Sequence, residues 1–439
     1  MIMSQIVFIL LVITVAFLSK KFYGRVIRNI KLGKKYDLNL DKSKAWKNVF
    51  LIALGQKKMF KLTIPAIFHL FIYVAFIITQ IELIEIFVDG ITGNHRTFAP
   101  VLGGFYTFVI SFIEILSILA FVSTIVFLYR RNALKVPRLV MSELNGWPKL
   151  DANLILIGEL LLIVGIFMMN GADMVLQSRG VEHYHVTGQF AVSSWLGPAL
   201  FGGLSDNTLV ILERAGWWLH ILVVFGFVLY LPFSKHLHIL FAFPNVYFSS
   251  QKPRGEMDNM PAIMNEVKSM MGMPVEVAEV SDELPDFGAN DVMGLKWKNI
   301  LDAYSCTECG RCTAQCPANI TGKALSPRGI MMSIRDRANE IGENLDKGTQ
   351  DRETYKDGKS LFDYISREEI HACTTCNACV EACPVLINPL EPILEMRRYE
   401  ILSESTGPQD WLPMFNAIEN GGAVWQMNVD REHWMTDES

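Results

Sequence analysis

Five apolar stretches dominate the first 250 residues of this 439-residue chain. They lie near residues 2–18, 62–88, 105–129, 153–170 and 215–241. A helix needs about 20 residues to cross the hydrocarbon core of a bilayer. Since every backbone polar group must be bonded inside lipid, helices are the natural form for such stretches. The sequence therefore predicts five transmembrane helices over residues 1–250.

Basic residues between these stretches predict the orientation of the bundle. Lysine and arginine are frequent at 20–61 and 130–138, whereas the segments 89–104 and 171–214 hold one and two arginines and no lysine. Loops rich in these residues stay in the cytoplasm. We therefore expect the N-terminus outside and the C-terminal half in the cytoplasm. The first stretch lacks a basic start and a small-residue cleavage site, so we expect a retained anchor.

All eight cysteines lie in two runs with one spacing, C-x2-C-x2-C-x3-C, each followed by proline. This is the ligand spacing of ferredoxins with two 4Fe–4S clusters, in which the fourth cysteine of each run binds the other cluster. We predict one cluster at Cys306, Cys309, Cys312 and Cys383, and a second at Cys373, Cys376, Cys379 and Cys316. Zinc would need no such C-P ending. Clustered cysteines also favour metal binding in a reducing compartment over a disulfide framework.

The segment between the two runs predicts which kind of ferredoxin domain is present. "PRGIMMSIRDRANEIGENL" and "SLFDYISREEI" both have helical periodicity. We therefore expect a mainly α-helical protein, with an α-helical dicluster domain over 291–400. Residues 251–290 are interpreted as a linker that includes a short amphipathic helix, and 401–439 as a C-terminal tail.

Four histidines within the apolar stretches are candidate haem ligands: His69, His220, His236 and His238. Ionisable residues inside a membrane are costly and usually functional, and two imidazoles can hold a haem iron. On one continuous helix, His220 and His238 share a face five turns apart, although Pro232 lies between them. One haem would join His69 to His238 or His236. The alternative is that these histidines bond to neighbouring groups near the headgroups.

A second haem could use His220, but its partner is open. The outer segments offer His95, His183 and His185 as candidates. Three carboxylates in or near the spans, Glu82, Glu114 and Glu159, are candidates for carrying protons to a quinone. The alternative is that they form hydrogen bonds within the bundle.

Taken together, these motifs resemble known families. The five-span organisation resembles the haem b subunit of respiratory nitrate reductase, and the dicluster domain resembles heterodisulfide reductase-like iron–sulfur proteins. The whole chain is similar to membrane-bound oxidoreductases that link electron-transfer flavoprotein to menaquinone, including "SKHLHI" at 234–239 and "AIENGGAVWQ" and "REHWM" within 417–435. The resemblance implies one or two b haems, menaquinone as substrate, and a prokaryotic cytoplasmic membrane.

It also implies a hetero-oligomer in which the tail docks a partner. That partner would be electron-transfer flavoprotein, a separate iron–sulfur subunit with CCG motifs, or both. The expected function is the electron-transfer subunit of a quinone-linked oxidoreductase. The alternative is a subunit of a heterodisulfide or sulfite-pathway reductase, followed by a redox-sensing membrane protein. No phosphate loop or dinucleotide fingerprint occurs, so substrate chemistry is expected on a partner chain. The net charge of −5 gives no indication of nucleic-acid binding.

Overall fold

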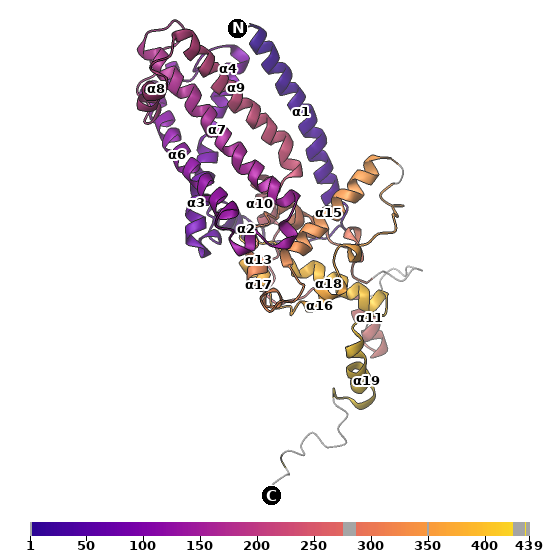
Figure 1. The fold of residues 1–439 in the computed structure, drawn as a ribbon. Coiled ribbons are helices and arrows are strands. Elements are labelled where there is room, and N and C mark those ends of the chain that lie inside the picture. The colour runs from indigo at the N-terminus through magenta and orange to yellow at the C-terminus, as the bar shows by residue number, and fades with distance from the viewer. Residues whose placement is uncertain (1, 275–286, 349–350, 425–434, 436–439) are drawn as a thin grey trace.

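A computed structural model describes residues 2–274, 287–348, 351–424 and 435. Figure 1 shows long helices side by side, with a domain of short helices at the end of them that lies away from the N-terminus. We call the long helices the bundle, residues 287–424 the C-terminal domain, and the end of the bundle next to it the inner end. Parts of the predicted linker (275–286) and tail (425–434 and 436–439) lie outside the described residues.

Five helices of the bundle are long and apolar enough to cross a membrane, by length and composition. They are α1 (Ile2–Ile30), α3 (Thr63–Ile78) continued by α4 (Gln80–Thr92), α6 (Gly104–Asn132), α7 (Trp147–Ser178) and α9 (Asp206–Tyr230). The prediction of five such helices is confirmed. Helix α1 continues past the predicted stretch through Lys20, Lys21 and Arg25, because polar residues can extend a helix beyond the hydrocarbon core.

The most extensive helix contact in the described residues joins α7 to α9. Two glycines allow it. A Cβ atom on Gly216 would lie 2.6 Å from the backbone nitrogen of Met169 and 2.8 Å from the carbonyl oxygen of Gly165. Small residues let helix backbones approach closely where lipid provides no hydrophobic driving force. This contact also fixes His220, whose backbone nitrogen lies 3.1 Å from a Cβ built on Gly165.

The fifth helix is interrupted where one continuous helix was predicted. Helix α9 ends at Tyr230, two 3-10 turns follow at Leu231–Phe233 and Lys235–Leu237, and α10 begins at His238 (His238–Tyr247). Pro232 has no N–H to continue the helical ladder. Asp151 stabilises the break by accepting hydrogen bonds from Ser234 Oγ (2.6 Å) and Lys235 N (3.1 Å). The argument that His220 and His238 share one helix face is therefore wrong.

The C-terminal domain is built from short helices, and no strand occurs among its described residues. They are α12 (Trp297–Ser305), α13 (Arg311–Ala314), α14 (Pro317–Ile320), α15 (Pro327–Asp346), α16 (Arg367–Ala372), α17 (Ala378–Ala382) and α18 (Leu390–Arg398). On α15, Ile330, Ile334 and Ile341 are fully buried and recur at helical spacing. The predicted helical character of this domain is confirmed.

The remaining α-helices are α2 (Lys42–Asn48), α5 (Ala99–Leu102), α8 (Ser193–Phe201), α11 (Pro261–Met270) and α19 (Leu412–Gly421). Helix α11 is the amphipathic helix expected in the linker. One π-helical segment (Val49–Leu54) leads towards α3, and another (Tyr399–Ser403) continues α18.

Buried hydrogen bonds attach the C-terminal domain to the bundle. Asn245 Nδ2 on α10 donates to the carbonyl oxygen of Val385 (2.9 Å), and Lys298 Nζ donates to Asn245 Oδ1 (2.9 Å). On α1, Asn29 Nδ2 donates to the Tyr304 hydroxyl (2.9 Å). The two parts are therefore joined through α1 of the bundle and through α10, the short helix that follows the interrupted fifth span.

Candidate metal centres

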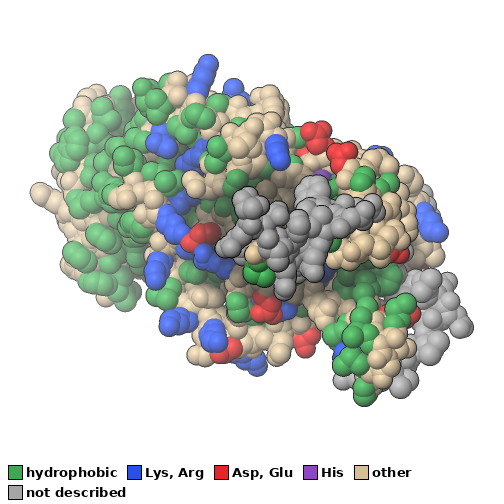
Figure 2. Space-filling model, turned by 90° about the horizontal axis from the view of Figure 1, so that it is seen from below, with side chains coloured by type: hydrophobic (Ala, Val, Ile, Leu, Met, Phe, Trp, Pro, Cys, Tyr) green, Lys and Arg blue, Asp and Glu red, His purple; other side chains and the backbone are tan. Residues whose placement is uncertain are grey.

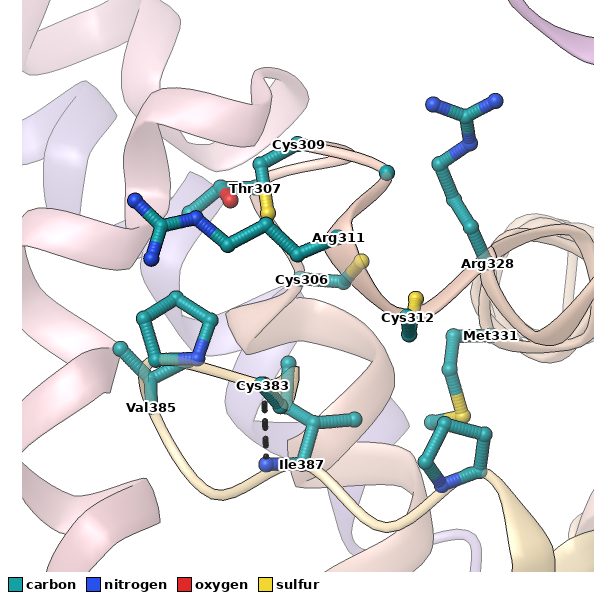
Figure 3. A pocket seen from close by; sticks show the side chains of 13 residues that line it. Cys306, Thr307, Cys309, Arg311, Cys312, Arg328, Met331, Cys383, Val385 and Ile387 are labelled. Atoms are coloured by element: carbon teal, nitrogen blue, oxygen red, sulfur yellow. Dashed lines mark hydrogen bonds between the residues drawn. The ribbon is translucent and has the colours of Figure 1, made fainter. Parts of the chain in front are cut away.

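The first cysteine run surrounds a small cavity together with a cysteine from the second run. Cys306, Cys309, Cys312 and Cys383 all line it, and Figure 3 shows the side chains of the first three turned towards one another. Helix α13 packs against α17, which brings Cys383 to this cavity although it lies 67 residues after Cys316 in the sequence. The structure thus gathers the four cysteines predicted for one cluster.

Both runs have the same local backbone, which explains how each presents three thiols. The residue two positions after the first cysteine has a positive φ, 54° at Glu308 and 55° at Thr375. The residue four positions after the first cysteine also has a left-handed φ, 69° at Gly310 and 61° at Asn377. Glycine and asparagine tolerate this conformation. In each run the N–H two positions on donates to the sulfur of the first cysteine, at 3.4 Å.

Electrostatic contacts place the fourth cysteine of each run beside the other run. Burial, followed by the charge of Cys309, raises the pKa of the Cys383 thiol to about 12. Burial, followed by Cys373, raises the pKa of Cys379 to about 12, and Cys316 adds to this shift. Thiols with such pKa values stay protonated at neutral pH unless a metal replaces the proton. The crossed arrangement is the one that two cubanes would need.

The spacing of these groups differs from that of a single-ion site. Among the described residues, no three or more His, Cys, Asp or Glu side chains converge as they would around one ion. Each thiolate of a 4Fe–4S cluster binds its own iron, so its ligands lie further apart. Each set includes two buried cysteines, and Cys376 of the second set is the exposed one.

Arginines from the first run and from the bundle loops connect this cavity to the inner end. Arg138, after α6, donates from Nη1 to the carbonyl oxygen of Cys309 (2.8 Å). Arg311, inside the run, donates to the carbonyl oxygens of Lys58 (3.3 Å) and Met59 (3.2 Å), just before α3. The first run is therefore one of the parts of the C-terminal domain that face the bundle, together with the segment around Val385 after the second run.

Three of the predicted histidines meet at the inner end. The rings of His236 and His238 stack with centroids 5.6 Å apart, and both lie within electrostatic reach of His69. The Nδ1 atom of His69 bonds to Gln56 Oε1 (3.1 Å), and that of His238 to the carbonyl oxygen of Lys235 (3.1 Å). By contrast, the buried Nδ1 of His236 has no partner.

The carboxylate Glu159 lies beside His236. Its Oε1 atom is 3.9 Å from His236 Nε2, and its Oε2 accepts a hydrogen bond from Thr124 Oγ1 (3.1 Å). Of the three carboxylates singled out from the sequence, Glu159 is thus the one at the inner end.

His220 is separate from this group. Its Nδ1 bonds to the carbonyl oxygen of Leu162 (3.0 Å). Of its candidate partners, His95 lies 3.5 Å from Asp173 Oδ1 and against the ring of Tyr184, while His183 and His185 are exposed in the loop after α7. Within the described residues, no contact joins any of the three to His220.

Glu82 and Glu114 belong to a buried polar network in the outer half of the bundle. Asn170 Nδ2 lies 3.4 Å from an oxygen of each, and Glu114 also accepts from the backbone N–H groups of Val192 (2.7 Å) and Ser193 (3.0 Å). The other oxygen of Glu82 is buried without a partner.

Arg96 organises this network, and the sequence interpretation missed it. Its guanidinium donates to Asp173 (2.6 Å), Asn170 (2.7 Å) and the Tyr106 hydroxyl (2.9 Å). The polar residues of "MNGAD" in an otherwise apolar helix, Asn170 and Asp173, were the available signal. Glu82, His95 and Arg96 line a small cavity here.

Comparisons with known proteins agree with the cysteine chemistry. Residues 305–387 match the 4Fe–4S dicluster domain family. The chain is 29% identical to the probable iron-sulfur-binding oxidoreductase FadF of Bacillus subtilis, over 92% of this chain and 57% of that protein. It is 24% identical to the EtfAB:quinone oxidoreductase of Syntrophomonas wolfei, over 94% of this chain and 56% of that protein.

A shorter match covers 28% of this chain and 62% of a ferredoxin:CoB-CoM heterodisulfide reductase subunit of Methanosarcina mazei, at 27% identity. The chain spans somewhat more than half the length of the first two relatives. No solved structure matches it. The chain thus carries a 4Fe–4S dicluster domain and is related to iron–sulfur oxidoreductases and their subunits.

Proposed function

We propose that this chain is the electron-transfer subunit of a quinone-linked membrane oxidoreductase, passing electrons between a cytoplasmic partner and menaquinone. The observation that carries the proposal is the junction at the inner end. There the first cysteine run contacts the bundle loops through Arg138 and Arg311, beside a group of half-buried histidines. Two 4Fe–4S clusters and haem b, when bound, supply one-electron redox chemistry.

Cys306, Cys309, Cys312 and Cys383 would hold one cluster, and Cys373, Cys376, Cys379 and Cys316 the other. The exposed Cys376 marks the side from which a partner can approach. The first run meets the bundle loops through Arg138 and Arg311. With one cluster near the surface and the other next to the bundle, the domain could receive electrons at its surface and deliver them towards the membrane, or the reverse.

His69 and His238 fit a haem better than His236 does. Metal-bound histidines usually donate the other ring N–H to a carbonyl or carboxylate, which fixes the ring and leaves Nε2 for the metal. Both His69 and His238 have such an Nδ1 partner, and His236 lacks one. His220 has the same arrangement, but no second histidine contacts it among the described residues. We therefore propose one haem, at the inner pair.

The outer cavity is the proposed site of quinone chemistry. Glu82 has a buried oxygen without a partner, and His95 has a buried Nδ1 without one. A quinol releases two protons on oxidation, so two unpartnered groups in one cavity suit its hydroxyls. The S. wolfei relative is described as an EtfAB:quinone oxidoreductase. An electron-transfer flavoprotein, or an iron–sulfur subunit with CCG motifs, is the proposed partner in a hetero-oligomer.

The distribution of charge supports a cytoplasmic C-terminal domain at a prokaryotic membrane. Figure 2 shows Lys and Arg side chains gathered between the hydrophobic side of the molecule and the C-terminal domain. Lys42, Lys44 and Lys47 are exposed near this end. Basic residues next to transmembrane ends favour the cytoplasmic side. Membership of a heterodisulfide reductase is the second candidate function, because one component of that enzyme matches over 28% of the chain.

Optical spectra of the purified chain before and after dithionite test this function. We expect iron–sulfur bleaching together with the sharp α band of bis-histidine haem b, and one haem per chain by the pyridine assay. His238→Ala should remove the haem, whereas the matched variant His236→Ala should retain it. A wild-type spectrum with iron–sulfur absorption alone would contradict the haem assignment.

A further inference from the structure

Lys235 occupies the point where the bundle meets the first cysteine run. It begins the 3-10 turn that follows the break in the fifth helix, and it is 8% exposed. Its ammonium forms an ion pair with Glu308 and donates to the carbonyl oxygen of Pro148 at 2.6 Å. Asp151, the carboxylate that stabilises the break, lies 4.0 Å from the same nitrogen. A lysine so deeply buried needs these partners.

Glu308 places this ion pair next to an iron–sulfur ligand. It lies between Cys306 and Cys309 in the sequence, and its N–H donates to the sulfur of Cys306 at 3.4 Å. Glu308 is 3% exposed, and its second oxygen accepts from Arg335 Nη2 at 2.8 Å. The charge of Lys235 therefore acts on the loop that surrounds the first cavity.

The backbone of Lys235 acts on the histidine site. Its carbonyl oxygen is the partner of His238 Nδ1, at 3.1 Å. One residue thus contacts a predicted cluster ligand through Glu308 and a proposed haem ligand through its carbonyl. A continuous set of short contacts runs from Cys306 through Glu308 and Lys235 to His238.

We propose that Lys235 is a positioning residue that couples the iron–sulfur site of the first run to the histidine site at the inner end. It does so in two ways. Its ammonium sets the electrostatic environment of the first cluster through Glu308, and its carbonyl orients His238. The second role rests on the proposed haem, whereas the first requires only the cluster.

The direction of the electrostatic effect follows from the charges. Reduction adds an electron to a cluster, so a nearby positive charge favours the reduced state and a nearby negative charge opposes it. Replacing Lys235 with methionine leaves Glu308 paired with Arg335, so the loop keeps one of its two ionic contacts. Lys235→Met should then favour the oxidised cluster, and Glu308→Gln should favour the reduced cluster.

The test is an EPR-monitored redox titration of the full chain in detergent with its clusters bound. In Lys235→Met we expect one of the two cluster waves to shift by about tenfold in reduction equilibrium, about 59 mV to lower potential for one electron. The other wave should not move. Glu308→Gln should move the same wave to higher potential, and Lys235→Arg should restore the wild-type value.

Lys296→Met is the matched control. Lys296 is a half-buried lysine of this region with ionic partners, Asp258 and Glu391, but it is not bonded to a cysteine run. It should leave both waves unchanged. The proposal is overturned if Lys235→Met and Glu308→Gln shift neither wave, or shift one in the same direction, as loosened packing would.

A haem readout separates this inference from the proposed function. If the wild type lacks a haem band, the haem assignment fails, but the cluster waves still decide the electrostatic role of Lys235. If the band is present, Lys235→Met should retain it, because the variant keeps the backbone carbonyl that orients His238, and loss of the band in Lys235→Met would overturn the separation of the two roles.

Discussion

Arg328 offers the sharpest test of the junction between the bundle and the C-terminal domain. Its side chain is fully buried. Nη1 donates to the carbonyl oxygens of Arg138 (2.6 Å) and Glu308 (3.3 Å), and Nη2 donates to Glu143 Oε1 (2.8 Å). Arg138 and Glu143 lie between α6 and α7, and Glu308 lies in the first cysteine run. Arg328→Met should therefore loosen both segments together.

The structure gives the size of this effect. Methionine cannot donate, so two carbonyls and one carboxylate lose a partner. Breaking a buried ion pair by removing one member costs about 3–5 kcal/mol. The Glu143 side chain is 23% exposed and can be partly rehydrated, which favours the lower limit. For a domain of about 140 residues, about 3 kcal/mol corresponds to a fall in Tm of about 10 °C.

Thermal loss of iron–sulfur absorption in the full chain measures this change. Lys323→Met, at an exposed position of the same domain, is the control and should melt within about 2 °C of the wild type. The melting temperature of Arg328→Lys should lie between those of Arg328→Met and the control, because an ammonium cannot reproduce the planar fork of donors. If Arg328→Met melts with the control, these contacts do not hold the junction and the reasoning is refuted.

Three further predictions follow from the geometry. Cys383→Ser should remove the cluster held mainly by the first run, and Cys316→Ser the cluster held mainly by the second, as counted by iron content and EPR. If each variant instead loses the cluster of the run in which it lies, the crossed assignment is contradicted. Gly216→Ala should destabilise the bundle by about 1–3 kcal/mol, read from its melting temperature, because backbone atoms occupy the space of the new Cβ. Hydrogen bonds from Arg337 hold the pKa of Asp357 below its usual 3.8. Since the folded-state pKa is lowered, this contact should stabilise the domain fully above about pH 5 and be lost as pH falls below 4. In Asp357→Asn, the melting temperature should therefore fall less steeply as the pH is lowered below about 4.

The cysteine runs were predictable from sequence because their chemistry fixes their spacing. Three thiols on a tight turn need left-handed residues at set positions, and both Gly310 and Asn377 satisfy this requirement. The five long helices were equally predictable, since about 20 apolar residues have few other folds available in lipid. Periodicity in α15 identified a helical domain because apolar residues at helical spacing form one buried face.

Other features depended on contacts between distant residues. The break before Lys235 is stabilised by Asp151 from another helix, so hydropathy extended the fifth span too far. The choice between His236 and His238 depends on which Nδ1 finds a partner, and spacing cannot reveal this. Arg96 has ordinary neighbours in sequence, and its role depends on Asp173 from a different helix.

The attachment of the C-terminal domain has a consequence for how the protein meets its partner. Contacts from α1 through Asn29 and from α10 through Asn245 hold the domain in one orientation on the bundle. A domain fixed at two places cannot swing out to collect electrons, as a tethered carrier does. The partner proposed above would therefore have to bring its own redox group to a fixed docking site on the side of the exposed Cys376, because the C-terminal domain cannot carry the electrons to it.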